Sequence, residues 1–142
     1  MKALFLSIIF FATIISCKKT NSPTEIIEPC PVVENLDSAS TSQKLVGTWL
    51  WRKQACMLVP LRDADKEVKV KFSSTGNFTV TENSIVVAQG TWVIRSVGTN
   101  KWRLNLSSYS SYLAGFVGFC NNQVEFDERI IDGCLHIFTR VT

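Results

Sequence analysis

Five cysteines are the residues of this chain whose chemistry depends most on their placement. Cys17 directly follows an apolar N-terminal stretch, and the other four are Cys30, Cys56, Cys120 and Cys134. An even number of cysteines in an exported domain is typical of a disulfide framework, and four cysteines allow three connectivities. The alternative is that all four stay reduced and buried.

The single histidine, His136, is the other candidate for chemistry. It could serve as a general base, or it could bind zinc together with Cys134. The sequence has no Cys-x-x-Cys pair and no third ligand at a suitable spacing, which argues against a metal site. It also lacks a Gly-x-Ser-x-Gly turn and a phosphate-binding loop. We therefore expect a protein that is not an enzyme and that needs no cofactor.

Residues 1–16 predict an export signal. Lys2 precedes the mostly apolar stretch Ala3–Ile15, which is shorter than the roughly 20 apolar residues needed to span a bilayer. The sequence Ile14-Ile15-Ser16-Cys17 resembles the lipobox of bacterial lipoproteins. That resemblance implies cleavage before Cys17 and stable membrane anchoring through two or more acyl chains on this residue. The alternative is an ordinary signal peptide followed by an unrelated cysteine.

The net charge of the mature chain bears on which partners it can bind. Without Lys2, the 15 Lys and Arg residues become 14, against 12 Asp and Glu, so the mature net charge is +2. This balance, without a basic run that contains aromatic residues, argues against a nucleic-acid partner. Lys18 stands where an acidic residue can retain lipoproteins in the inner membrane. We therefore expect an outer-membrane location in the cell envelope of a Gram-negative bacterium.

The mature chain divides into two parts. Residues 17–43 predict a lipidated cysteine and a flexible tether, because they are rich in Ser, Thr, Pro and acidic residues and show little periodicity. Residues 44–142 suit one domain. The core of a domain of this size is modest, so crosslinks would help to stabilise it.

From residue 44 onward, short alternating runs separated by turn residues predict an all-β domain. Val68, Val70 and Phe72 alternate with charged residues, as in a half-buried strand. The segment Tyr112–Phe119 is a weak strand because it contains two glycines. The expected strands are 44–56, 67–72, 77–82, 84–95, 101–107, 112–119, 122–131 and 134–141. Eight strands joined by short turns favour a small up-and-down antiparallel β-barrel. A seven-stranded open barrel and a sandwich are the alternatives.

The last hairpin gives a specific register. Asp132-Gly133 predicts a two-residue turn, so paired residue numbers should sum to 265. Ile130 and Leu135 then face each other inside the barrel, and Ile137 lies on the same inner face. In the same register, His136 lies on the outer wall opposite Arg129.

The alternating strand directions select one cysteine pairing. Cys56 ends the first strand at the end of the barrel where Cys134 begins the adjacent last strand. Cys120 lies at the opposite end, and Cys30 precedes the first strand at that same end. Along an extended strand Cys120 and Cys134 would lie about 30 Å apart, whereas a disulfide needs Cα atoms within about 7 Å. We predict the disulfides Cys56–Cys134 and Cys30–Cys120.

The ordered motifs of residues 44–142 resemble those of small lipocalin-like lipoproteins of Gram-negative bacteria. Gly47-Thr48-Trp49 is followed by Phe72-Ser-Ser-Thr-Gly76-Asn-Phe78, Gly90-Thr91-Trp92, Asp132-Gly133-Cys134 and Arg140. The resemblance implies a lipocalin-like barrel in which Trp49 packs at the closed end under Arg140, with a cation–π contact between them. In the register above Arg140 points outward, so its side chain would have to curl under the rim.

An eight-stranded barrel can hold one small ligand or be filled by side chains. In the first case, the chain is a membrane-anchored lipocalin-like protein that binds a small hydrophobic molecule. Lys53, if it points inward near the upper mouth, would meet an anionic head group. The expected ligand-binding residues are Trp51, Lys53, Phe72, Phe78, Trp102 and Phe126.

In the second case, the filled barrel is a protein-interaction or structural module of the cell envelope. The loop Met57–Lys66 begins with a contiguous apolar run, and exposed apolar surface of this kind usually marks a contact. We expect this loop to meet an envelope protein. Its alternative role is a plug over the barrel mouth, which it would frame together with Ser107–Tyr112.

Overall fold

A computed structural model describes residues 28–31 and 33–142. The predicted signal peptide, Cys17 and the first part of the expected tether lie outside the described residues. No helix within the described ranges is long and apolar enough to cross a membrane. The elements are α1 (Ser38–Leu45), β1 (Gly47–Cys56), β2 (Val59–Asp63), β3 (Val68–Phe72), β4 (Asn77–Glu82), β5 (Ile85–Gly98), β6 (Lys101–Leu106), β7 (Phe116–Cys120), β8 (Gln123–Asp127), the 3-10 helix η1 (Arg129–Ile131) and β9 (Cys134–Arg140).

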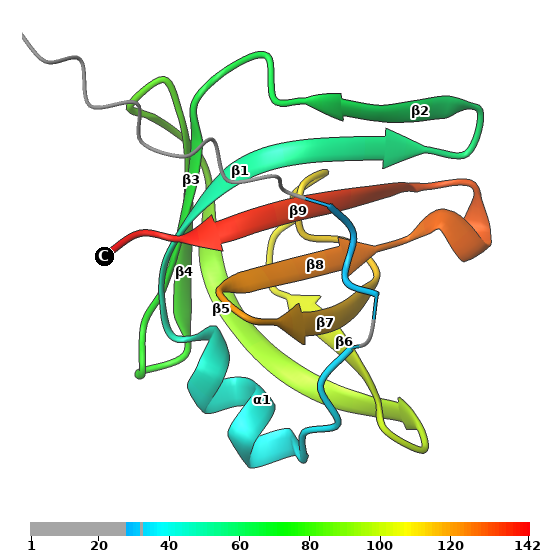
Figure 1. Cartoon of the computed structure of the whole chain (residues 1–142). Helices are drawn as coiled ribbons and strands as arrows, with labels where there is room; N and C mark the ends of the chain where they lie inside the picture. The colour runs from blue at the N-terminus through cyan, green and yellow to red at the C-terminus, as the bar shows by residue number, and fades with distance from the viewer. Residues whose placement is uncertain (1–27, 32) are drawn as a thin grey trace, which may run out of the picture.

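Eight antiparallel strands form a closed barrel (Figure 1). Each of β3 to β9 pairs with its neighbour in sequence, β1 pairs with β3, and pairing of β1 with β9 closes the ring. The additional strand β2 pairs with the second half of β1. This topology confirms the predicted up-and-down barrel. Closure through β9 excludes the open seven-stranded alternative.

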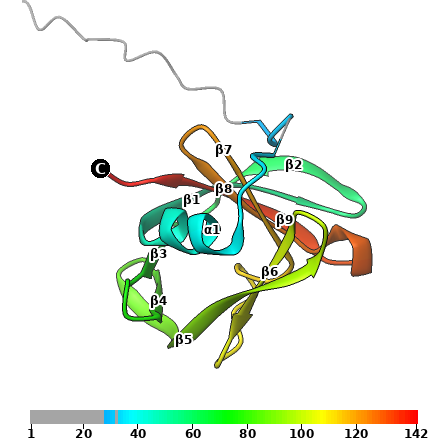
Figure 2. The same cartoon turned by 90° about the horizontal axis from the view of Figure 1, so that it is seen from below.

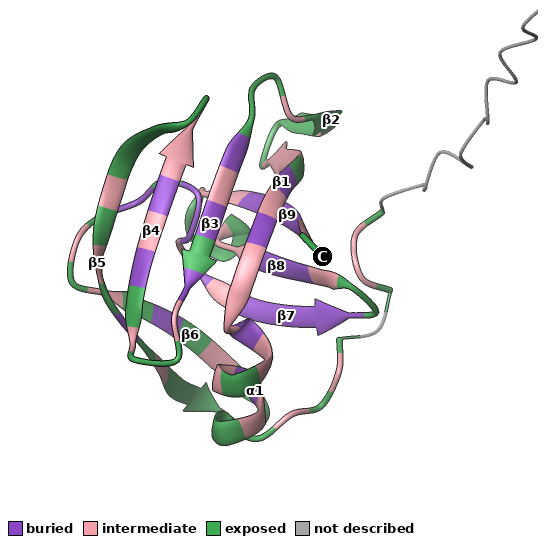
Figure 3. Cartoon of the chain, turned by 90° about the vertical axis from the view of Figure 1, so that its left-hand side faces the viewer, coloured by how far each residue is buried: buried purple, intermediate pink, exposed green. Residues whose placement is uncertain are grey.

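Alternation along the strands explains why the sheet closes around one core. In β3, Val68, Val70 and Phe72 are buried, whereas Lys69 and Lys71 are half-buried or exposed. The same alternation is visible along β4 (Figure 3). Successive side chains of a strand point to opposite faces, so an apolar residue at every second position places one face inside.

The register between β8 and β9 differs from the predicted one. Phe126 pairs with His136, and Val124 pairs with Phe138, so paired numbers sum to 262 rather than 265. The expected two-residue turn is wrong, because the chain forms η1 and then places Asp132 in the left-handed region at φ 63°. A shift of three positions reverses the face that β9 presents to the interior.

The reversed face changes what β9 contributes to the barrel. His136 and Phe138 point inward, opposite the buried Phe126 and Val124 of β8. Leu135 and Ile137, which the prediction placed inside, instead form a small separate cluster with Ala55 and Leu61. The extra strand β2 therefore covers apolar side chains on the outer wall of the barrel.

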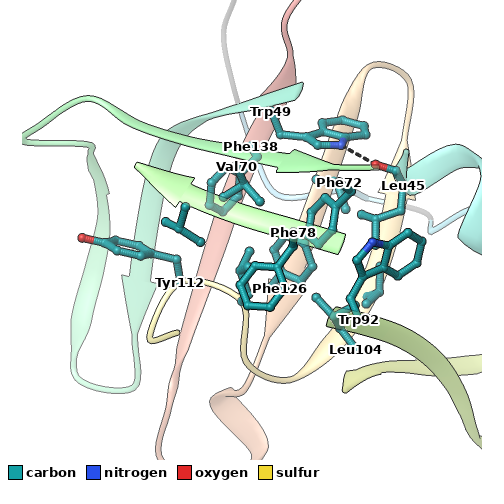
Figure 4. Packing of buried hydrophobic residues seen from close by; sticks show 14 of the residues in the cluster. Leu45, Trp49, Val70, Phe72, Phe78, Trp92, Leu104, Tyr112, Phe126 and Phe138 are labelled. Carbon is teal, nitrogen blue, oxygen red and sulfur yellow. Dashed lines mark hydrogen bonds between the residues drawn. The ribbon is translucent and has the colours of Figure 1, made fainter. Parts of the chain in front are cut away.

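Helix α1 closes one end of the barrel. Seen from below, it lies across the middle of the ring of strands (Figure 2). Asp37 caps the helix by accepting a hydrogen bond from the Ser40 amide. Leu45 at the helix C-terminus is fully buried, and its carbonyl accepts a hydrogen bond from the Trp49 indole at 2.7 Å (Figure 4).

The segment before α1 packs on the barrel wall (Figure 1), although it falls in the range expected to be a flexible tether. We call residues 28–31 and 33–37 the strap. The Glu34 amide donates to the Phe119 carbonyl at 2.8 Å, and Val33 lies over Gly118. The polar composition of residues 17–43 did not indicate an ordered segment. The strap is held by a crosslink and by backbone hydrogen bonds rather than by a periodic apolar face.

Candidate functional site

The barrel interior is the first candidate site, because four of the expected ligand-binding residues point into it. Trp51, Phe72, Phe78 and Phe126 are between 0% and 5% exposed. Phe72 lies 6.5 Å from Phe78 and 6.4 Å from Phe126, measured between ring centroids. These distances are typical of packed aromatic pairs, so the aromatic rings fill this part of the interior (Figure 4).

The other two expected ligand-binding residues lie elsewhere. A β-bulge between Trp51 and Lys53 shifts the register of β1. As a result, Lys53 pairs with Ile137 on the outer face, and its ammonium lies 3.9 Å from Asp63 of β2. The expected inward position of Lys53 is wrong, because the bulge reverses the face of β1 from that point onward.

Trp102 lies outside the buried core cluster and is half-buried. Its indole donates to the Leu36 carbonyl of the strap at 2.8 Å. The sequence placed Trp102 on the correct face of its strand but could not place the strap beside it. Trp102 therefore joins the strap to β6 instead of lining a space within the barrel.

The mouth opposite α1 is plugged by residues 107–115. Tyr112 and Leu113 belong to the core cluster, and Leu113 is fully buried. The Tyr112 hydroxyl donates to Glu82 at 2.6 Å, and Lys66 bonds the other oxygen of the same carboxylate at 2.8 Å. The hydrogen bonds from Lys66 and Tyr112 hold the pKa of Glu82 below its ordinary value. This network fastens the plug to β4.

His136 completes the upper part of the core rather than lying on the outer wall. Its ring centroid is 5.7 Å from those of Trp51 and Tyr112. The imidazole is 6% exposed, and its Nδ1 atom is buried without a hydrogen-bond partner among the described residues. Burial lowers its pKa to about 4. The sequence held no signal for this position, which depends on the register set by η1.

The closed end holds the expected pair of Trp49 and Arg140. The Arg140 guanidinium carbon lies 4.3 Å from the Trp49 ring centroid. Its two terminal nitrogens donate to the carbonyls of Val46, at 2.9 Å, and Lys44. The two residues are paired in register, so Arg140 shares the inner face of β9. The predicted contact is confirmed, and the outward direction that seemed to oppose it is wrong.

A glycine next to this pair explains part of the Gly-x-Trp motif. Gly47 has φ 138°, and a Cβ atom on it would overlap the Arg140 guanidinium. A larger residue would therefore strain the backbone and displace Arg140.

Both predicted disulfides are confirmed. Cys30 and Cys120 are joined with Cα atoms 5.7 Å apart, which ties the strap to β7. Cys56 and Cys134 are joined with Cα atoms 4.1 Å apart, which ties the end of β1 to the start of β9. The barrel topology alone was sufficient to select this connectivity.

The Cys56–Cys134 disulfide also braces an exposed apolar surface. The turn between β1 and β2 and the helix η1 lie side by side in both views (Figures 1 and 2). Leu58 is 94% exposed, Ile130 75% and Ile131 62%. We define the apolar tip as Met57, Leu58, Val59, Ile130 and Ile131. The expected interaction loop therefore forms a β-hairpin that holds apolar side chains in water, and residues 107–115 form the plug.

Comparisons of the chain with protein-family models, with curated proteins and with solved structures found no match. The eight-stranded barrel is consistent with a lipocalin-like fold, and the functional inference rests on the residues themselves.

Proposed function

We propose that this chain is a lipid-anchored protein of the bacterial cell envelope whose filled barrel acts through its surface, as a module that binds an envelope protein. The observation that carries the proposal is the interior packed with aromatic side chains, combined with an apolar tip that is left in water. Trp51, Phe72, Phe78 and Phe126 contribute their surface to the core. A barrel with this packing favours contact at its surface over storage of a small hydrophobic ligand.

The lipid anchor is supported by the lipobox-like sequence that ends at Cys17. Twelve residues separate Cys17 from Cys30, where the disulfide attaches the strap to the barrel. At about 3.4 Å per extended residue, the thirteen steps from Cys17 to Cys30 reach no farther than about 45 Å. The proposed anchor therefore keeps the barrel close to the membrane surface, where its partner would also lie.

The apolar tip supports a protein partner. Burying a large aliphatic side chain is worth about 1.5–3 kcal/mol, and the tip presents five such side chains on adjacent turns. The charged residues Arg129 and Asp132, both exposed, directly flank Ile130 and Ile131 in the sequence. An apolar centre with a polar rim is the usual composition of a protein–protein contact.

Lipid attachment is tested by metabolic labelling with an alkyne-bearing fatty acid in a Gram-negative host. The wild-type chain should incorporate the label and fractionate with the outer membrane. The Cys17→Ser variant should do neither. Equal labelling of both proteins would remove the anchor from the proposal without affecting the role of the tip.

The role of the tip is tested by site-specific photocrosslinking in cells of the native host. A photoreactive residue at Leu58 should give one protein adduct of defined mass, and one at Ile131 should give the same adduct. A photoreactive residue at the exposed Lys71, on the wall formed by β3, is the matched control. The same adduct pattern at all three positions, or no adduct at the two tip positions, would contradict the proposal.

A further inference from the structure

A groove opens at the wall of the barrel beside the strap, and its lining includes Val117 of the core cluster. Its volume is about 290 Å³, and β7 forms its floor with Phe116 and Gly118. Val33 of the strap and Trp102 of β6 line it, and the exposed Ile130 of η1 lines it as well. The apolar part of the lining therefore comes from four separate segments.

The groove is shaped by two features of the strap. Gly118 has no side chain, so Val33 can pack closely against it. A Cβ atom at position 118 would lie only 3.2 Å from the methyl groups of Val33. The hydrogen bond between Trp102 and Leu36 holds the indole against the strap. The pairing between β6 and β7 covers only two residue pairs, so the strap and not β6 borders the rest of β7.

One carboxylate is buried among these apolar groups. Glu125 of β8 lines the groove and is 7% exposed. One of its oxygens accepts a hydrogen bond from the Cys30 amide at 2.6 Å. Within the described residues, its carboxylate forms no salt bridge and accepts no other hydrogen bond. Burial accordingly raises its pKa above the ordinary value.

In the part of the chain that the structure describes, no cationic side chain forms a salt bridge with Glu125. Asp127 is held by Arg129, through hydrogen bonds of 2.9 and 2.8 Å. Lys101 lines the groove but is exposed, and it forms no salt bridge to the described residues. A buried carboxylate is stabilised strongly when a hydrogen-bonding cation is brought to it. The groove thus combines apolar walls with one anionic group that has no cationic partner among residues 28–31 and 33–142.

We infer that this groove is a binding site for a small organic amine that carries an apolar body, with the ammonium group at Glu125 and the apolar body against Trp102, Phe116 and Val33. The inference does not depend on the proposed function of the apolar tip. An alcohol of the same shape would leave the charge of Glu125 unpaired and would bind less tightly. An anion of the same shape would be repelled.

The test is a two-dimensional NMR titration of the mature chain with 2-phenylethylamine, and with 2-phenylethanol as the neutral control of equal size. The amine should bind at least about tenfold more tightly than the alcohol, because a hydrogen bond to a charged group is worth more than one between neutral groups. Amide shifts should concentrate at Val33, Trp102 and Gly118. Equal affinities, or shifts that concentrate away from these residues, would overturn the inference.

Two variants separate binding from folding. Glu125→Gln retains an acceptor for the Cys30 amide but removes the charge, so the preference for the amine should disappear. Ile130→Ser changes an exposed residue and should weaken both probes together without unfolding the barrel. Glu67→Gln, which removes an exposed carboxylate beside β3, should change neither affinity. Retention of the amine preference in Glu125→Gln, or unchanged affinities in Ile130→Ser, would contradict the site.

Discussion

A single buried imidazole couples the stability of this barrel to pH. The pKa of His136 is about 4 in the folded chain and 6.5 ordinarily, so the unfolded chain binds a proton over this interval and the folded chain does not. The free energy of unfolding is therefore fully retained above pH 6.5 and decreases as the pH falls toward 4. The decrease approaches about 3 kcal/mol across the interval.

The pH prediction is checked by chemical denaturation at several pH values between 6.5 and 5. This window lies above the ordinary pKa of Glu82 and Asp127, whose lowered values affect stability at more acidic pH. Glu125 has a raised pKa and adds a pH dependence of opposite sign, so the two proteins are compared in the Glu125→Gln background. In that background His136→Phe, which keeps an aromatic ring beside Trp51 and Tyr112, should lose the pH dependence in this window. An unchanged slope in the variant would show that another group is responsible.

Arg140 should stabilise the closed end through its shape as well as its charge. Arg140→Leu removes the cation–π contact with Trp49 and leaves two carbonyls without their donor. We expect a loss of about 2–3 kcal/mol in the free energy of unfolding. Arg140→Lys should recover less than half of this loss, because one ammonium group cannot reproduce the two planar guanidinium donors that bond the carbonyls of Val46 and Lys44. Arg95→Leu, at an exposed position of β5, is the control and should change stability by less than about 0.5 kcal/mol.

Residue positions could be predicted from the sequence where they depended on alternation within one strand. Phe72, Phe78 and Phe126 point inward as expected. Lys53 and His136 could not be placed, because each follows a local irregularity that reverses a strand face. The bulge in β1 and the 3-10 helix before β9 depend on local backbone conformations that the apolar pattern does not report.

Among the elements, the plug should contribute strongly to stability. Leu113 is fully buried in the core cluster, so Leu113→Ala should lower the free energy of unfolding by about 2–5 kcal/mol through lost burial and the cavity it leaves. Tyr109→Ala changes a residue of the same segment that is 83% exposed, and should have little effect. Thermal and urea unfolding measure both. Equal losses in the free energy of unfolding for the two substitutions would contradict the stabilising role of the plug.

The strap depends on its crosslink. Replacing both Cys30 and Cys120 by serine should make the strap accessible to protease while the barrel remains folded, because β1–β9 pairing and the second disulfide are untouched. The matched control replaces Cys56 and Cys134 by serine, which should leave the strap protected. Limited proteolysis followed by intact mass measurement distinguishes these outcomes. Equal strap cleavage in the two variants would contradict the crosslink's role.

The element boundaries were predictable to different degrees. Strands β3, β4 and β6 lie within a residue or so of their expected ranges, because clear alternation and turn residues define them. β7 begins at Phe116 rather than Tyr112, since Tyr112 and Leu113 are drawn into the core as part of the plug. α1 and β2 were not expected, because both are short and are stabilised by packing on the barrel rather than by a strong local pattern.

For the molecule as a whole, topology was more predictable than function. The order of strand directions was sufficient for the closed barrel and for both disulfides. The choice between a ligand-holding and a filled barrel depended on side-chain packing around Phe72 and on the plug. Neither can be derived from alternation alone, because inward-facing aromatic residues suit both kinds of barrel.

The proposed function requires that the interior of the barrel is occupied by the protein's own side chains. Native mass spectrometry of residues 18–142, purified from the periplasm without added lipid, tests it most directly. The expected mass is that of the bare polypeptide, reduced by the four hydrogens lost in two disulfides. A reproducible additional mass that disappears on denaturation, and that persists undiminished in Ile130→Ser and so does not occupy the outer groove, would contradict it.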